Sequence, residues 1–120
     1  MYIGYDTVVI IIGILAAIAI PVFLAQRERA NEAACRSDVR NANAAAVAYA
    51  ASNNGSYAGM DNAALVAQGW NRSAQSTNPQ VTGSGGGGAP TANAYRISVD
   101  CTGAPQPTYF FDTSTGRVQP

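Results

Sequence analysis

The sequence lacks lysine and histidine and has few charged residues of either sign. Its basic residues are all arginine, and seven basic residues balance seven acidic ones, so the formal net charge at pH 7 is zero. A neutral chain lacks the strong positive field that draws proteins to nucleic acid, and DNA binding is not indicated. Without histidine, the usual general base and the commonest metal ligand are also missing.

Motifs for catalysis or cofactor binding are absent as well. The stretch GSGGGG is not followed by the Lys-Ser or Lys-Thr of a phosphate-binding loop, so it predicts a flexible surface loop. Asp61, Asp100 and Asp112 have a spacing that matches no known calcium loop, and we interpret them as scattered surface acids. No nucleophile has a partnered base. The sequence therefore predicts no enzyme, no cofactor, no metal site and no small-molecule substrate.

The sequence does contain an uncharged apolar run, residues 8–25. As a helix this run would be about 27 Å long, close to the roughly 30 Å hydrocarbon core of a bilayer. A secretory signal peptide fits poorly, because Asp6 stands where a basic segment is expected and no small-residue cleavage site is evident. A plain membrane anchor fits the length, but it does not explain why the helical pattern continues beyond the run.

The helical pattern continues from Gln26 into a polar, alanine-rich segment. Apolar residues recur there every three or four positions, at Cys35, Val39, Ala42, Ala46 and Tyr49. Glu32 precedes Arg36 by four positions, which is the favourable orientation for a helical ion pair. We expect one helix from near residue 3 to residue 53, ended by Asn53-Asn54-Gly55. At about 75 Å it is too long for a small domain to cover, so its apolar half must be buried in lipid or against other copies.

Two residues weaken the apolar half of this helix. Pro21 removes one backbone hydrogen bond and clashes with the preceding turn, at a cost of about 3 kcal/mol. Gly13 adds further weakness upstream. The segment between them could be helical in one environment and extended in another, which suits a subunit that moves from a membrane into a polymer.

The segment IIGILAAIAIPVFLAQRERA, residues 11–30, resembles the N-terminal signature of type IV pilins and the related pseudopilins. Weaker similarity to the family is found in YAASNNGSYAG and DNAALVAQGW, and YRISVDC and TYFFDTSTGRVQP resemble the ends of pilins from Gram-positive bacteria. The resemblance implies an α+β fold, in which a small antiparallel β-sheet packs on the C-terminal half of a long N-terminal α-helix. It divides the chain into residues 1–25, an apolar helix half that is membrane anchor and filament core, and residues 26–120, a globular pilin domain.

The first six residues, MYIGYD, depart from the family pattern. Family members carry a Glu inside the apolar segment, after a cleaved basic leader. That position falls on Gly4 here, and Asp6 is the nearby acid. We interpret MYIGYD as an already processed or altered start.

Beyond the long helix, the pattern changes to short elements. Residues 61–68 predict a short helix closed by Gly69, and residues 71–94 a polar loop with one edge strand around Val81. Three further segments have strand patterns, and they are residues 95–101, 108–112 and 117–119.

The two cysteines lie on surfaces that we expect to face one core. Cys35 lies on the apolar helix face, and Cys101 shares its strand face with Tyr95, Ile97 and Val99. In a chain exported across a membrane, this placement predicts a disulfide, with two buried free thiols as the alternative. Closing a loop of about 66 residues would contribute about 4 kcal/mol by the chain-entropy model.

The resemblance implies a structural subunit, the major pilin of a type IV pilus. Such a subunit is held in the inner membrane, is processed by a prepilin peptidase, and joins a helical filament of identical subunits outside the cell through the pilus assembly machinery. The residues expected to make assembly contacts are Asp6, Gly13, Ile14, Leu15, Ile18, Pro21 and Phe23. One alternative is the major pseudopilin of a type II secretion system, whose family usually has a Ca²⁺ site and no such disulfide. Another is a monomeric anchored binding domain, which the helix continuing through Pro21 disfavours.

Overall fold

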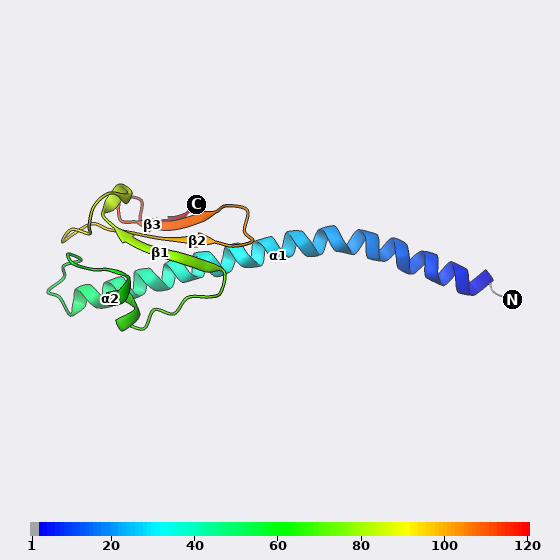
Figure 1. The fold of residues 1–120 in the computed structure, drawn as a ribbon, viewed down its shortest axis with the longest axis horizontal. Coiled ribbons are helices and arrows are strands. Elements are labelled where there is room, and N and C mark those ends of the chain that lie inside the picture. Colours follow the sequence, from blue (N-terminus) through cyan, green and yellow to red (C-terminus); the bar gives the residue numbers. More distant parts are fainter. Residues whose placement is uncertain (1–2) are drawn as a thin grey trace.

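The computed structural model describes residues 3–120, and within the long helix it describes the side chains of residues 4, 6–17 and 23–51. The molecule is elongated, with extents of 80 × 25 × 20 Å. Helix α1, Ile3–Ala51, runs along the whole length. Its N-terminal half projects from a head that is built on its C-terminal half (Figure 1).

Helix α1 ends at the turn that the sequence indicates. Asn54 and Gly55 both adopt left-handed backbone conformations, with φ of 57° and 77°. The Gly55 amide donates to the Ala50 carbonyl at 2.7 Å, which satisfies one of the last carbonyls of the helix. The last helical residue is Ala51, so the expected end at residue 53 is two residues too far along the chain.

Helix α2, Asn62–Ala67, confirms the short helix predicted over residues 61–68. The Asp61 carboxylate accepts a hydrogen bond from the Ala64 amide at 2.8 Å, which caps the first turn. Leu65 faces the core and is fully buried. Gly69 follows with φ of 94°, a conformation that glycine adopts without strain.

The four strands form one antiparallel sheet in the order β1-β2-β3-β4. Their bounds are Ser76–Thr82, Arg96–Cys101, Thr108–Asp112 and Arg117–Gln119. Strand β1 is longer than the edge strand expected around Val81, because it pairs with β2 through a bulge between Thr77 and Gln80. The bulge contains Pro79, which has no amide hydrogen to donate and is therefore suited to an edge strand.

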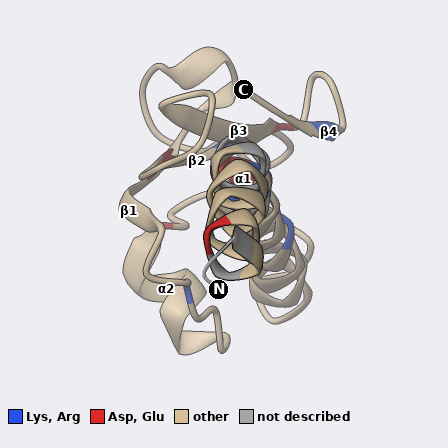
Figure 2. Ribbon diagram, turned by 90° about the vertical axis from the view of Figure 1, so that its right-hand side faces the viewer, with Lys and Arg blue, Asp and Glu red and all other residues tan. Residues whose placement is uncertain are grey.

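The core lies between the sheet and the C-terminal half of α1. Figure 2, a view from the N-terminal end, shows the sheet across one side of α1 and helix α2 beside it, toward β1. The predicted helix face is confirmed, since four of its members are fully buried, namely Cys35, Val39, Ala42 and Ala46. The predicted strand face is confirmed too, and its buried members are Tyr95, Ile97, Val99 and Cys101.

Asp112 is not the surface acid that the sequence suggested. It is fully buried at the end of β3. Ser84 and Gly85 of the Gly-rich loop donate to its carboxylate at 2.6 and 2.8 Å. The Gly-rich loop lies on the surface as expected, but Asp112 ties it to the sheet.

Candidate assembly surface and its disulfide-bonded head

The projecting half of α1, which we call the apolar half, exposes large apolar side chains on both sides of residues 18–22 along the helix, whose side chains are outside the described part. Each of its large apolar side chains is more than half exposed, and they are Val8, Val9, Ile10, Ile11, Ile12, Ile14, Leu15, Phe23 and Leu24. An apolar surface of this extent is unusual on a soluble monomer, and in other proteins such surfaces are sites of contact with protein or membrane.

Most of the predicted assembly residues with described side chains lie on this surface. Asp6, Ile14, Leu15 and Phe23 are exposed, and Gly13 has open space where a side chain would begin. The side chains of two further predicted residues, Ile18 and Pro21, lie outside the described part of the structure. The structure contains one copy of the chain, so the assembly role of all seven residues stays a prediction.

The apolar half was also expected to anchor the chain in a membrane. Within the residues whose placement is described, no helix offers a stretch both long and apolar enough to span a bilayer. The expected run, residues 8–25, includes residues 18–22, whose side chains are outside the described part. Membrane anchoring therefore stays a prediction.

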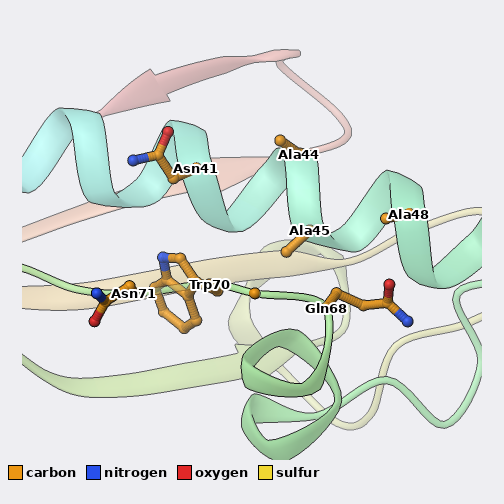
Figure 3. A pocket seen from close by; sticks show the side chains of 8 residues that line it. Asn41, Ala44, Ala45, Ala48, Gln68, Trp70 and Asn71 are labelled. Carbon is orange, nitrogen blue, oxygen red and sulfur yellow. The ribbon is translucent and has the colours of Figure 1, made fainter.

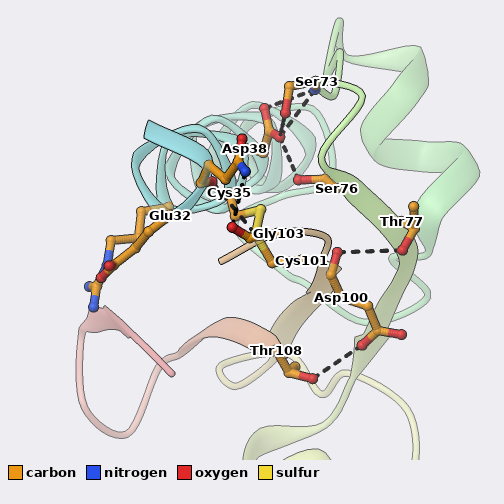
Figure 4. Close-up of a disulfide and its surroundings, with 12 residues drawn as sticks. Glu32, Cys35, Asp38, Ser73, Ser76, Thr77, Asp100, Cys101, Gly103 and Thr108 are labelled. Carbon is orange, nitrogen blue, oxygen red and sulfur yellow. Dashed lines mark hydrogen bonds and ion pairs between the residues drawn. A yellow bond between two sulfur atoms is a disulfide. The ribbon is translucent and has the colours of Figure 1, made fainter. Parts of the chain in front are cut away.

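A disulfide joins the long helix to the sheet near the point where the head begins. Cys35 of α1 and Cys101 of β2 are bonded, with a Cα–Cα distance of 6.0 Å, so the predicted pair is present (Figure 4). Close by, the Asn31 side-chain amide donates to the Gly103 carbonyl at 3.0 Å. The bond crosses 66 residues of chain and prevents the sheet from separating from α1.

A buried carboxylate holds the segment before β1 against α1. Asp38 accepts hydrogen bonds from the Ser73 hydroxyl at 2.6 Å and from the Ser76 hydroxyl (Figure 4). The Trp70 indole donates to the Asp38 carbonyl at 2.9 Å. Sequence reasoning missed this residue, although Asp38 lies three positions after Cys35 and so near the buried helix face.

The predicted helical ion pair is confirmed and reaches the sheet. Arg36 pairs with Glu32 at 3.0 Å and donates to the Val118 carbonyl at 3.3 Å. Its guanidinium also lies 5.2 Å from the centre of the Tyr109 ring, within the range of a cation–π contact. Tyr109 is fully buried, and its hydroxyl has no hydrogen-bond partner among the described residues.

The head has several shallow grooves. The groove of about 350 Å³ in Figure 3 lies between α1 and the segment that follows α2. Its lining consists of Asn41, Ala44, Ala45, Ala48, Gln68, Gly69, Trp70 and Asn71. None of these side chains is a nucleophile or a general base. Within the described residues, no three His, Cys, Asp or Glu side chains lie close enough together to hold a metal ion.

These features define a pilin-like protein, with a long helix that carries a bare apolar half and a head of antiparallel strands. The structure is similar to that of a type IV pilin protein from Thermus thermophilus, with a TM-score of 0.57 and 26% sequence identity. The similarity covers 74% of this chain and 95% of that chain. No protein-family model and no curated protein matches the sequence. The predicted α+β fold and the resemblance to type IV pilins are thus confirmed.

Proposed function

We propose that this chain is the major pilin of a type IV pilus, a structural subunit that polymerises through the apolar half of α1 into an extracellular filament. The observation that carries the proposal is the extent of exposed apolar surface on that half. Packing Ile10, Ile14 and Leu15 against neighbouring copies would contribute about 25 cal/mol per Å² of buried apolar area. The similarity to a solved type IV pilin supports the same function.

Before assembly, residues 1–25 would hold the subunit in the inner membrane. A lipid bilayer would cover the same apolar side chains that neighbouring copies cover later. The partners at that stage would be a prepilin peptidase and the pilus assembly machinery. Residues 26–120 would remain outside the bilayer as the head.

The disulfide favours a pilin over the alternative, a major pseudopilin of a type II secretion system. Cys35 and Cys101 are bonded within the head, and the pseudopilin family usually lacks such a bond. A fibre subunit exposed outside the cell gains from a covalent link, because the environment there is oxidising and mechanically demanding.

The test is filament formation by the full chain in cells that supply a pilus assembly machinery. Electron microscopy of the sheared surface fraction should show filaments with the wild-type chain and none with Ile14→Glu. Val66→Glu is the matched control, because Val66 is an equally exposed apolar residue on α2. Filaments of equal abundance with Ile14→Glu, or none with the wild type, would contradict the proposal.

A further inference from the structure

The charged residues of α1 include a stripe whose two ends have no partner within the described chain. Glu28, Glu32, Arg36 and Arg40 follow one another at intervals of four residues, so they lie on a stripe that winds slowly around the helix. The inner two, Glu32 and Arg36, pair with each other. The outer two are exposed and form no ion pair with any described residue.

Arg40, at the basic end of the stripe, lines a groove. Arg40 of α1 and Arg117 of β4 line a groove of about 310 Å³, together with Asn43, Phe111 and Val118. A basic position at β4 is visible in Figure 2. None of the residues that line the groove is acidic. Two guanidinium groups beside apolar side chains suit a carboxylate, because each guanidinium offers several donors in a fixed plane.

We propose that Glu28 of one copy binds in the groove between Arg40 and Arg117 of a neighbouring copy in the filament. The inference rests on the proposed function and adds to it the partner of each charge. Glu28 suits the groove because it is an unpaired, exposed acid at the junction between the apolar half and the head.

The placement of the two ends also fits a polymer. Glu28 and Arg40 are twelve residues apart, about 18 Å along the helix axis at 1.5 Å per residue. Two parallel copies displaced along α1 by a distance on the order of 18 Å bring Glu28 of one beside Arg40 of the other. The bound pair then keeps one free acid, on one copy, and one free groove, on the other. Such a head-to-tail contact repeats from copy to copy without closing.

Charge reversal in the full chain tests the contact. The variants are Glu28→Arg, Arg40→Glu and the double variant with both changes, expressed in cells with a pilus assembly machinery. We expect each single change to reduce the yield of sheared filaments at least tenfold, since attraction becomes repulsion at every subunit contact. The double variant should recover at least half of the wild-type yield. Gln106→Glu, which adds an acid at an exposed position of the head, should leave the yield unchanged.

A second measurement separates folding from assembly. The amount of each variant in the membrane fraction, with the Cys35–Cys101 bond intact, should equal that of the wild type. The inference is overturned if wild-type filaments form and the single variants assemble equally well. It is also overturned if the single variants fail and the double variant does not recover. Absence of wild-type filaments would overturn the proposed function itself, and this inference with it.

Discussion

At the scale of single residues, Asp112 shows how one buried charge holds several segments together. Its carboxylate accepts from Ser84 and Gly85 of the Gly-rich loop, from the Ser114 amide at 2.9 Å and from Arg96 at 2.9 Å. Burial alone would raise the pKa of Asp112, but the hydrogen bonds from Ser84, Gly85 and Ser114 lower this pKa well below its ordinary range. The residue therefore stays ionised in the folded protein at all physiological pH values.

We expect Asp112→Asn to lower the free energy of unfolding by about 3 kcal/mol at neutral pH, because Arg96 loses its buried counter-charge. The folded pKa of Asp112 lies below the unfolded value of about 4. The carboxylate's contribution is therefore complete above that value and is lost as the pH falls toward the folded pKa. The difference in the free energy of unfolding between wild type and Asp112→Asn should therefore become smaller in acid. Thermal unfolding of both proteins in detergent micelles, at neutral pH and again near pH 2.5, measures this difference.

Asp100→Asn is the control for this experiment. Asp100 is a half-buried acid on the neighbouring strand, where it accepts from Asn78 and Thr108 at 3.2 Å. Asp100→Asn should lower the free energy of unfolding by about 1 kcal/mol. Equal destabilisation by Asp112→Asn at both pH values would contradict the role given to the Asp112 charge.

Two buried tyrosines should respond differently to loss of their hydroxyl groups. Tyr95 donates to the side chain of Asn43, and burial, followed by the nearby Tyr57, raises the pKa of Tyr95. Tyr109 has no such partner among the described residues. We expect Tyr95→Phe to cost about 1–2 kcal/mol and Tyr109→Phe to be neutral or slightly stabilising. Thermal unfolding of the two variants measures these changes. A larger loss of stability for Tyr109→Phe than for Tyr95→Phe would contradict the prediction.

At the scale of elements, the two halves of α1 differ in their surroundings: one half packs on the sheet, and the other is exposed. Its C-terminal half is an amphipathic helix whose buried face packs on the sheet, and its charged stripe is half-buried at Glu32 and Arg36 and exposed at Arg40. Its N-terminal half exposes apolar side chains all around the helix between residues 8 and 15, so that this described stretch has no polar face. In the isolated chain both halves form the single helix Ile3–Ala51.

We expect the backbone between Gly13 and Pro21 to unwind when the chain enters a filament. Pro21 cannot donate a hydrogen bond, and its ring disfavours helical geometry near Ala17. Ile20 precedes proline and is therefore biased toward extended angles. Each carbonyl freed in an apolar filament core costs a few kcal/mol, so the unwound stretch must be short. In a bilayer the segment should stay closer to helical, because lipid offers no partner for free backbone groups.

Cryo-electron microscopy of sheared filaments tests this prediction. A map with an unbroken helix through residues 11–24 would contradict the unwinding. The same map locates Asp6. A lone carboxylate at bilayer depth costs about 2.5–3.5 kcal/mol, so in the fibre Asp6 should lie near a neighbour's amino terminus or another polar group. Asp6 surrounded only by aliphatic side chains would contradict that pairing.

At the scale of the whole molecule, the folded head and the projecting apolar half of α1 are two distinct parts. The head is closed by its own core and by the Cys35–Cys101 bond, while the apolar half of α1 extends beyond it (Figure 1). We therefore expect a chain that begins at Gln26 to be a soluble monomer with the head intact. Size-exclusion chromatography with light scattering measures its mass, and mass spectrometry without reduction shows whether the disulfide has formed. Filaments formed by the shortened chain would show that residues 8–24 do not drive assembly.

Much of the fold could be predicted from the sequence, because it depends on periodicity. The spacing of Cys35, Val39 and Ala42 defined the buried face of α1, and the alternation of Ile97, Val99 and Cys101 defined the inner face of β2. Periodicity therefore predicted that both cysteine side chains face the core, before it was known that they are bonded. The exposed apolar half of α1 also followed from the sequence, since the predicted helix is longer than a small domain can cover.

The tertiary structure alone decided the roles of the buried polar groups. Asp38 and Asp112 resemble any other acids in the sequence, and their partners Ser73 and Ser84 lie 35 and 28 residues away along the chain. Strand β1 likewise depends on its register with β2, because its own residues are mostly polar. Periodicity is a local property of the chain and shows which way a side chain points. The partner of a buried carboxylate, or of an edge strand, is set only when distant segments come together.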